Sequence, residues 1–214
     1  MSKKYSYIGV SFMILIFGIY VIPKVVSRYQ KSDLVVFNKV PDFEFVNQNG
    51  KTITNKNFED KVYVVEFFFT TCPSICPIMT TKMLTIQDEF YGNPAFGIAS
   101  FSITPEIDTP EVLKAYTEQH NITSRNWHLL TGNSDEVVYA LANKGFKLYA
   151  GKTDGEHGGF EHSGLFALID KEGYIRSRKD AYGNPIMYYR ALKESDFPDQ
   201  ISELKEDIKI LLNE

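Results

Sequence analysis

The chain has 214 residues and a formal net charge of −4, and 43% of its residues are hydrophobic and 14% aromatic. This composition is typical of a folded domain with a sizeable core, and it excludes a disordered or low-complexity protein. The slightly acidic balance, without an extended basic run, speaks against nucleic acid as a partner.

A short basic lead and a long uncharged segment open the chain. Residues 1–4 contain two lysines, and residues 5–22, YSYIGVSFMILIFGIYVI, carry no charge. About 20 apolar residues cross a bilayer, and the small-residue cleavage pattern of a signal peptide does not follow. We therefore predict a transmembrane anchor at 5–22, a linker at 23–38 and one domain at 39–214. An apolar N-terminal segment usually exports the domain behind it, so we expect the domain on the extracytoplasmic side, in the periplasm or its equivalent.

Strand and helix signals alternate along the rest of the chain. Apolar–polar alternation around Asn49-Gly50 predicts a β-hairpin at 40–53. The nearly continuous apolar run at 62–69, VYVVEFFF, predicts a central strand that is buried on both faces. Further strands are predicted at 95–103, 127–130, 165–170 and 174–178, and helices at 77–90, 108–116, 134–143 and 201–211. This order predicts an α/β sandwich with an N-terminal β-hairpin.

Both cysteines of the chain lie in one short stretch, FFFTTCPSICPIMT, at residues 67–80. Pro77 has no N–H group and is disfavoured inside a helix, so we expect a tight turn from Cys72 to Cys76 and a helix that begins at Pro77. This turn places both sulfurs at the positive end of the helix dipole, where thiolates are stabilised. Such a pair can hold a soft metal ion, act as a redox-active dithiol, or form a small permanent disulfide.

A metal bound by two thiolates needs a further ligand, and the chain has four histidines: His120, His128, His157 and His162. Two thiolates suit Cu(I) and Zn(II), each of which accepts imidazole as well. His162 is the preferred candidate because it lies in FEHSGLFALID, directly before a predicted buried strand. By analogy with thioredoxin-type folds, the loop before that strand packs against the cysteine turn.

Four segments, FFFTTCPSICP, FSITPEIDTPEVLKAY, WHLLTG and EHSGLFALIDKEG, closely resemble the Sco/SenC family in sequence, order and spacing. The resemblance extends from about Pro41 to the last helix. It implies a membrane-anchored, thioredoxin-like protein that binds copper, as Cu(I) or Cu(II), and supports assembly of the dinuclear copper centre of cytochrome c oxidase. The implied partner is the oxidase subunit that carries this centre. Cys72 and Cys76 match the family's paired copper-binding cysteines, and His162 matches its third ligand.

The same residues allow a second function, in which Cys72 and Cys76 are the catalytic pair of a thiol–disulfide oxidoreductase that reduces copper-site cysteines of a partner. Thioredoxin-like redox enzymes favour C-x-x-C, whereas this chain has C-x-x-x-C. A permanent Cys72–Cys76 disulfide is less favoured, because closing so short a loop stabilises little. Two residues depart from the family pattern, since Ser74 and Thr104 stand where aspartate is common. These changes remove no ligand but bear on partner recognition and redox tuning.

Overall fold

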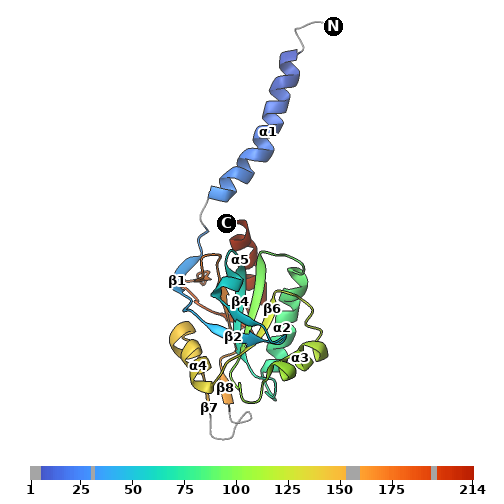
Figure 1. The fold of residues 1–214 in the computed structure, drawn as a ribbon. Helices are drawn as coiled ribbons and strands as arrows, with labels where there is room; N and C mark the ends of the chain where they lie inside the picture. Colours follow the sequence, from blue (N-terminus) through green and yellow to red (C-terminus); the bar gives the residue numbers. More distant parts are fainter. Residues whose placement is uncertain (1–5, 30–31, 153–159, 194–196) are drawn as a thin grey trace. The chain divides into compact units, whose positions relative to one another are not determined.

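The computed structural model describes residues 6–29, 32–152, 160–193 and 197–214 (Figure 1). The chain divides into two compact units, and the larger of them comprises residues 34–212. The smaller unit contains helix α1 (Ser6–Tyr29). Among the described residues, no helix combines the length and the apolar character needed to cross a membrane, so the anchor predicted at 5–22 finds no support there.

The larger unit is built on a nine-stranded sheet with the order β1-β10-β9-β4-β5-β6-β2-β3, in which β11 also pairs with β9. The pairs β4–β5 and β5–β6 are parallel, and the remaining pairs are antiparallel. The bounds of these strands are β1 Val35–Lys39, β2 Glu44–Asn47, β3 Thr52–Thr54, β4 Val62–Phe68, β5 Phe96–Ser102, β6 Trp127–Thr131, β9 Leu165–Ile169, β10 Tyr174–Ser177 and β11 Tyr189–Arg190. A separate two-stranded sheet is formed by β7 (Ala150–Lys152) and β8 (Phe160–His162).

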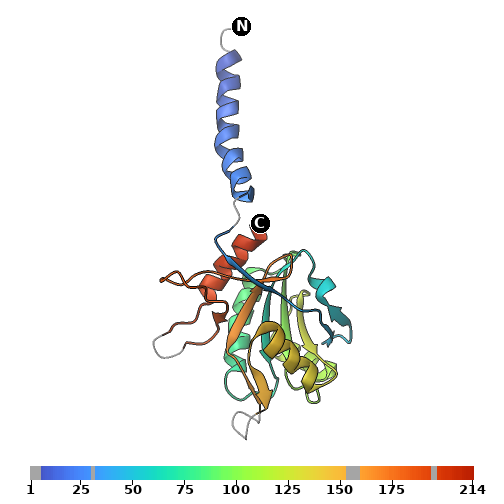
Figure 2. The same cartoon turned by 90° about the vertical axis from the view of Figure 1, so that its left-hand side faces the viewer.

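The helices of this unit lie on both sides of the sheet (Figure 2). They are the 3-10 helix η2 (Asn55–Phe58), α2 (Cys76–Glu89), α3 (Pro110–Gln119), α4 (Asp135–Ala140), the π-helix η3 (Leu141–Phe146) and α5 (Ile201–Asn213). Phe67 of β4 contacts Phe146 of η3, whereas the next residue, Phe68, contacts Tyr116 of α3. Because neighbouring side chains of a strand point to opposite faces, η3 and α3 cover opposite faces of the sheet.

The central strand and the hairpin are found where the sequence predicts them. All seven residues of β4 are buried, as expected for a strand covered on both faces. The predicted hairpin is formed by β2 and β3, in which Phe45 pairs with Ile53. The mixed α/β architecture with an N-terminal hairpin is therefore confirmed.

Two boundaries differ from the prediction. The linker predicted at 23–38 extends too far, because Val35–Lys39 form β1, which pairs with β10. Arg176 Nη2 also donates a hydrogen bond to the carbonyl of Leu34 at 3.2 Å. The outer edge of β10 needs a partner for its backbone groups, and the short apolar run Val35–Phe37 supplies it. The helix predicted at 134–143 is divided into α4 and the π-helix η3, and it extends to Phe146, whose buried ring joins the core.

Candidate metal centre

The cysteine turn joins the end of β4 to the start of α2. Cys72 N–H donates to the carbonyl of Phe69 at 3.3 Å, which closes a tight turn. Helix α2 begins at Cys76, one residue before the predicted start, and Pro77 occupies its first turn, where a missing N–H costs nothing. Both sulfurs therefore lie at the N-terminal end of α2, as predicted.

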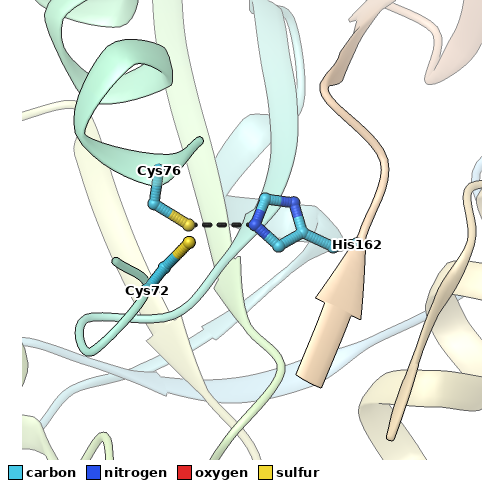
Figure 3. A group of neighbouring side chains, drawn as sticks. All are labelled: Cys72, Cys76 and His162. Atoms are coloured by element: carbon cyan, nitrogen blue, oxygen red, sulfur yellow. Dashed lines mark hydrogen bonds between the residues drawn. The ribbon is translucent and has the colours of Figure 1, made fainter. Parts of the chain in front are cut away.

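The hairpin of β7 and β8 brings His162 to this turn from a distant part of the sequence. His162 is the last residue of β8 and pairs with Ala150 of β7. Its Nε2 atom lies 2.9 Å from Cys76 Sγ. The two sulfurs and a ring nitrogen of His162 all lie within 4.8 Å of one another. Figure 3 shows the imidazole directed at the two sulfurs from the opposite side of the site.

The orientation of the imidazole is fixed by a backbone carbonyl. His162 Nδ1 lies 3.1 Å from the carbonyl oxygen of Ser163, which can only accept a hydrogen bond. The proton is therefore on Nδ1, and the lone pair of Nε2 faces Cys76. The ring also meets the edge of Phe69, with centroids 5.8 Å apart and the planes at 85°. This tautomer leaves Nε2 free to accept a thiol proton or to bind a metal ion.

The two thiols have different proton affinities. A hydrogen bond from Cys76 stabilises the Cys72 thiolate and lowers the pKa of Cys72. The same bond, together with burial, raises the pKa of Cys76. Of the two sulfurs, Cys76 therefore holds its proton more tightly than Cys72 does. Cys72 is also the more exposed of the two, at 7% against 1% for Cys76, so the thiolate is the outer sulfur.

A buried aspartate fixes the loop that leads to Cys72. Asp108 has no exposed surface, and its Oδ2 atom accepts hydrogen bonds from Thr70 N–H at 3.1 Å, Ser102 Oγ at 2.6 Å and Thr104 Oγ1 at 3.1 Å. The Thr70 hydroxyl donates to the other oxygen, Oδ1. A buried carboxylate is stable only when it is saturated with such donors. Asp108 thus ties the cysteine loop to the segment between β5 and α3.

Neither His120 nor His128 joins the site. His128 Nδ1 lies 3.2 Å from Asn47 Nδ2, and its ring packs edge-on against Phe58. His120 ends α3 and packs against Tyr116, with ring centroids 4.1 Å apart. His157 lies outside the described residues. Within the described part of the chain, Cys72, Cys76 and His162 are the one group of three or more side chains placed to hold a metal ion.

The donor set determines which chemistry the site can perform. Two sulfurs and one imidazole nitrogen suit Cu(I), a soft ion that accepts low coordination numbers. Neither cysteine takes part in a disulfide in the structure, and the two sulfurs are close enough for one to form after a small movement. The site therefore fits a copper ion, and it also fits a dithiol that exchanges electrons.

A model of the SCO1/SenC family matches residues 34–195, which is most of the chain. The chain belongs to the SCO1/SenC family. The SCO1 homologue of Bacillus subtilis is 32% identical over 168 residues, which cover 78% of this chain and 81% of the relative. In this Sco protein, the cysteine turn and His162 both lie within the residues that match the family.

Solved Sco structures share its fold. BsSco, described as a member of the Sco family of cytochrome c oxidase assembly proteins with a disulfide switch, superposes with a TM-score of 0.69 at 28% identity, over 86% of this chain and 98% of BsSco. Bradyrhizobium japonicum ScoI, solved with copper bound, has a TM-score of 0.63 at 21% identity, over 82% and 100% of the two chains. The predicted thioredoxin-like α/β fold is confirmed.

The two departures from the family pattern have different surroundings. Ser74 Oγ lies 3.7 Å from Cys72 Sγ, so its hydroxyl can donate to the thiolate, whereas an aspartate there adds a like charge. Thr104 Oγ1 donates to the buried Asp108 carboxylate. A hydroxyl at position 104 thus satisfies Asp108, where a second carboxylate would be repelled by it.

Sequence reasoning missed Asp108 and the carbonyl of Ser163. The sequence predicts only a helix at 108–116 for this segment, with Asp108 as its first residue. In the structure Thr109 is the cap of α3, its Oγ1 accepting from Val112 N–H, and Asp108 turns inward to the cysteine loop. A carboxylate followed by Thr-Pro in the segment after a buried strand is the only sequence signal. A carbonyl partner leaves no sequence signal, since every residue has one.

Proposed function

We propose that this Sco protein is a copper chaperone that binds one copper ion through Cys72, Cys76 and His162. Its cargo serves the assembly of the dinuclear copper centre of cytochrome c oxidase. The observation that carries the proposal is the convergence of two sulfurs and one imidazole nitrogen within 4.8 Å. The relative solved with copper bound and the assembly role stated for BsSco support it.

The geometry suits transfer rather than permanent storage. The outer sulfur belongs to Cys72, which is 7% exposed, whereas Cys76 is 1% exposed and forms the inner part of the site. A recipient thiolate can therefore approach the metal at Cys72 while Cys76 and His162 still hold it. Oxidation of the pair to a disulfide removes both thiolate ligands, so metal affinity depends on the redox state of the cysteines.

A second function, that of a thiol–disulfide oxidoreductase, is favoured by one observation: the two cysteines are free and their pKa values are shifted in opposite directions. The Cys72 thiolate would attack a partner disulfide, and Cys76 would then displace the partner, which leaves as a dithiol while Cys72 and Cys76 become the disulfide. Two electrons pass to the partner, and no metal is required.

Metal transfer and disulfide reduction can be separated with the copper-centre domain of the oxidase as recipient. We expect the copper-loaded protein to transfer its metal to the reduced recipient, and the copper-free protein to leave the oxidised recipient unreduced. Copper in the recipient is measured by its absorption spectrum after separation, and recipient thiols by alkylation and mass spectrometry.

The matched control is His162→Ala, which removes a metal ligand and leaves both cysteines. The variant should lose copper delivery, and any reductase activity should persist. If the copper-free protein reduces the recipient and the copper-loaded protein transfers no metal, the chaperone function is contradicted and the oxidoreductase function is supported.

We further propose that residues 5–22 anchor the protein in a membrane and that the copper-binding domain lies on the extracytoplasmic side. The support is the uncharged segment behind a basic lead in the sequence. The protein is expected to stay with the membranes of its cells after an alkaline carbonate wash, and protease added outside the membrane should digest the domain. Recovery of the intact chain in the soluble fraction contradicts the anchor.

A further inference from the structure

Glu66 is a buried acid in the central strand with only half of its carboxyl group satisfied. Its side chain is 3% exposed. Ser100 of β5 is its neighbour in the parallel register, and Ser100 Oγ donates to Glu66 Oε1 at 2.7 Å. Trp127 Nε1 in turn donates to Ser100 Oγ at 2.9 Å. The second oxygen, Oε2, has no hydrogen-bond partner among the described residues. Such a group is unstable as an anion and is not explained by packing.

Glu66 faces the side of the sheet on which the cysteine helix lies. Glu66 and Phe68 are two residues apart in β4 and share a face, and Phe68 contacts Tyr116 of α3. The Tyr116 hydroxyl lies 2.8 Å from Thr80 Oγ1 of α2, the helix that begins at Cys76. Glu66 is therefore in the layer between the sheet and the two helices α2 and α3.

The charges in this layer act on one another. The negative charge of Glu66 contributes to raising the pKa of Cys76 and that of Tyr116. Among the described residues, Cys76 at the start of α2, with its partner Cys72 in the cysteine turn, and Tyr116 of α3 are thus titratable groups within electrostatic reach of Glu66. Burial raises the pKa of Glu66 to about 7, and the hydrogen bond from Ser100 lowers it by a smaller amount. Glu66 consequently changes its charge near neutral pH.

We propose that Glu66 is a redox-linked proton acceptor, which takes up a proton when the Cys72–Cys76 pair is reduced and releases it when the pair is oxidised. This inference rests on the proposed function in one respect, namely that the pair cycles between a dithiol and a disulfide. Glu66 acts on the site through its charge and not as a ligand of the metal.

The chemical step balances with a small dithiol as the reductant. The dithiol gives two electrons and two protons and becomes a disulfide, while the Cys72–Cys76 S–S bond breaks. One proton goes to Cys76 Sγ, Cys72 Sγ keeps a negative charge, and the other proton goes to the Glu66 carboxylate. The reduced site then carries the same net charge as the oxidised site. An ionised Glu66 opposes reduction, because it faces a new thiolate across a medium of low polarity.

The test is a redox titration of the copper-free full-length protein against dithiothreitol between pH 5.5 and 9, for the wild type and Glu66→Gln. The redox state is followed by alkylation and mass spectrometry and by the fluorescence of Trp127, the single tryptophan, which is hydrogen-bonded to Ser100. At acid pH the two proteins should have equal equilibrium constants for reduction, since neither carries a charge at position 66. At alkaline pH the variant should be reduced about tenfold more readily, which corresponds to a coupling of one pKa unit.

Ser100→Ala is the second variant, and it keeps the inference testable if Glu66→Gln does not fold. Removing the Ser100 hydroxyl takes away a bond that lowers the pKa of Glu66. The effect of pH on the equilibrium constant for reduction should therefore persist in this variant, and it should appear at a higher pH than in the wild type. The matched control is Thr131→Val on the neighbouring strand β6, which removes a buried hydroxyl that has no partner among the described residues and should match the wild type.

Two results overturn the inference: a ratio between Glu66→Gln and wild type that does not change with pH, or a Ser100→Ala profile that coincides with the wild type. A separate copper titration of the wild type distinguishes this failure from that of the proposed function. If the wild type binds copper but the ratio of the two equilibrium constants does not change with pH, only the role of Glu66 is refuted. A protein that binds no copper but has a pH-dependent ratio refutes the chaperone and leaves the role of Glu66 intact.

Discussion

Cys76→Ser is expected to lower the affinity for Cu(I) at least about a hundredfold, more than the change typical for a residue that only supports a ligand. Cys76 Sγ is the inner sulfur and lies 2.9 Å from His162 Nε2. Serine has nearly the same shape, but its hydroxyl stays protonated and is a poor ligand for a soft ion. The measurement is a titration of the reduced protein with Cu(I) in competition with a coloured Cu(I) chelator, and the wild type should bind one equivalent.

Two further variants make this result specific. Ser74→Ala removes a hydroxyl from the same turn without removing a ligand, so its affinity should stay within about threefold of the wild type, as expected for one weak hydrogen bond. His162→Ala should weaken binding less than Cys76→Ser, because two thiolates remain. Wild-type affinity in Cys76→Ser would show that the paired sulfurs are not the copper site.

Asp108→Ala is expected to lower the free energy of unfolding by about 3 kcal/mol or more, the scale for removing one partner from a buried charged network. The change leaves Thr70 N–H and the hydroxyls of Thr70, Ser102 and Thr104 without their acceptor. Ser102 and Thr104 are fully buried, so water does not replace the carboxylate there. The free energy is measured by urea unfolding of the full-length protein at neutral pH.

The control for this prediction is Asp180→Ala in the turn after β10. Asp180 also accepts two backbone hydrogen bonds, from Tyr182 and Asn184, but it is exposed to solvent. Water replaces its carboxylate, so its loss should cost about 1 kcal/mol or less. Asp108→Asn keeps the shape of the side chain and should fold well enough for a copper titration, in which a looser Cys72 loop lowers affinity. Equal losses for the two alanine variants would contradict the anchoring role of Asp108.

The sequence was most informative where one local rule governs the structure. The run 62–69 predicted β4 because its residues are apolar on both faces, and Pro77 predicted the start of α2 to within one residue. Cys72 and Cys76 were found because they are the only two cysteines of the chain. These features depend on neighbours in the sequence and need no knowledge of the fold.

Features that depend on distant partners were not predicted. β7 and β8 are only three residues each, and their pairing is set by where the chain returns, not by their own periodicity. β1 is a strand because the edge of β10 is open beside it. His162 was preferred through its place before β9 and through the family resemblance, since nothing local distinguishes it from the other histidines. Glu66 stood in the predicted buried strand, where only the structure places Ser100 beside one of its oxygens.

The hairpin that carries His162 forms no ladder with the nine-stranded sheet in the described part of the chain. The sulfurs, by contrast, are held by the loop and helix that follow the central strand. The imidazole is therefore carried by a two-stranded sheet of its own. A movement of this hairpin that takes His162 away from the sulfurs breaks no strand pairing of the nine-stranded sheet. Substitutions in the β7–β8 hairpin can thus alter the rate of metal release while the cysteine turn and the central sheet stay unchanged.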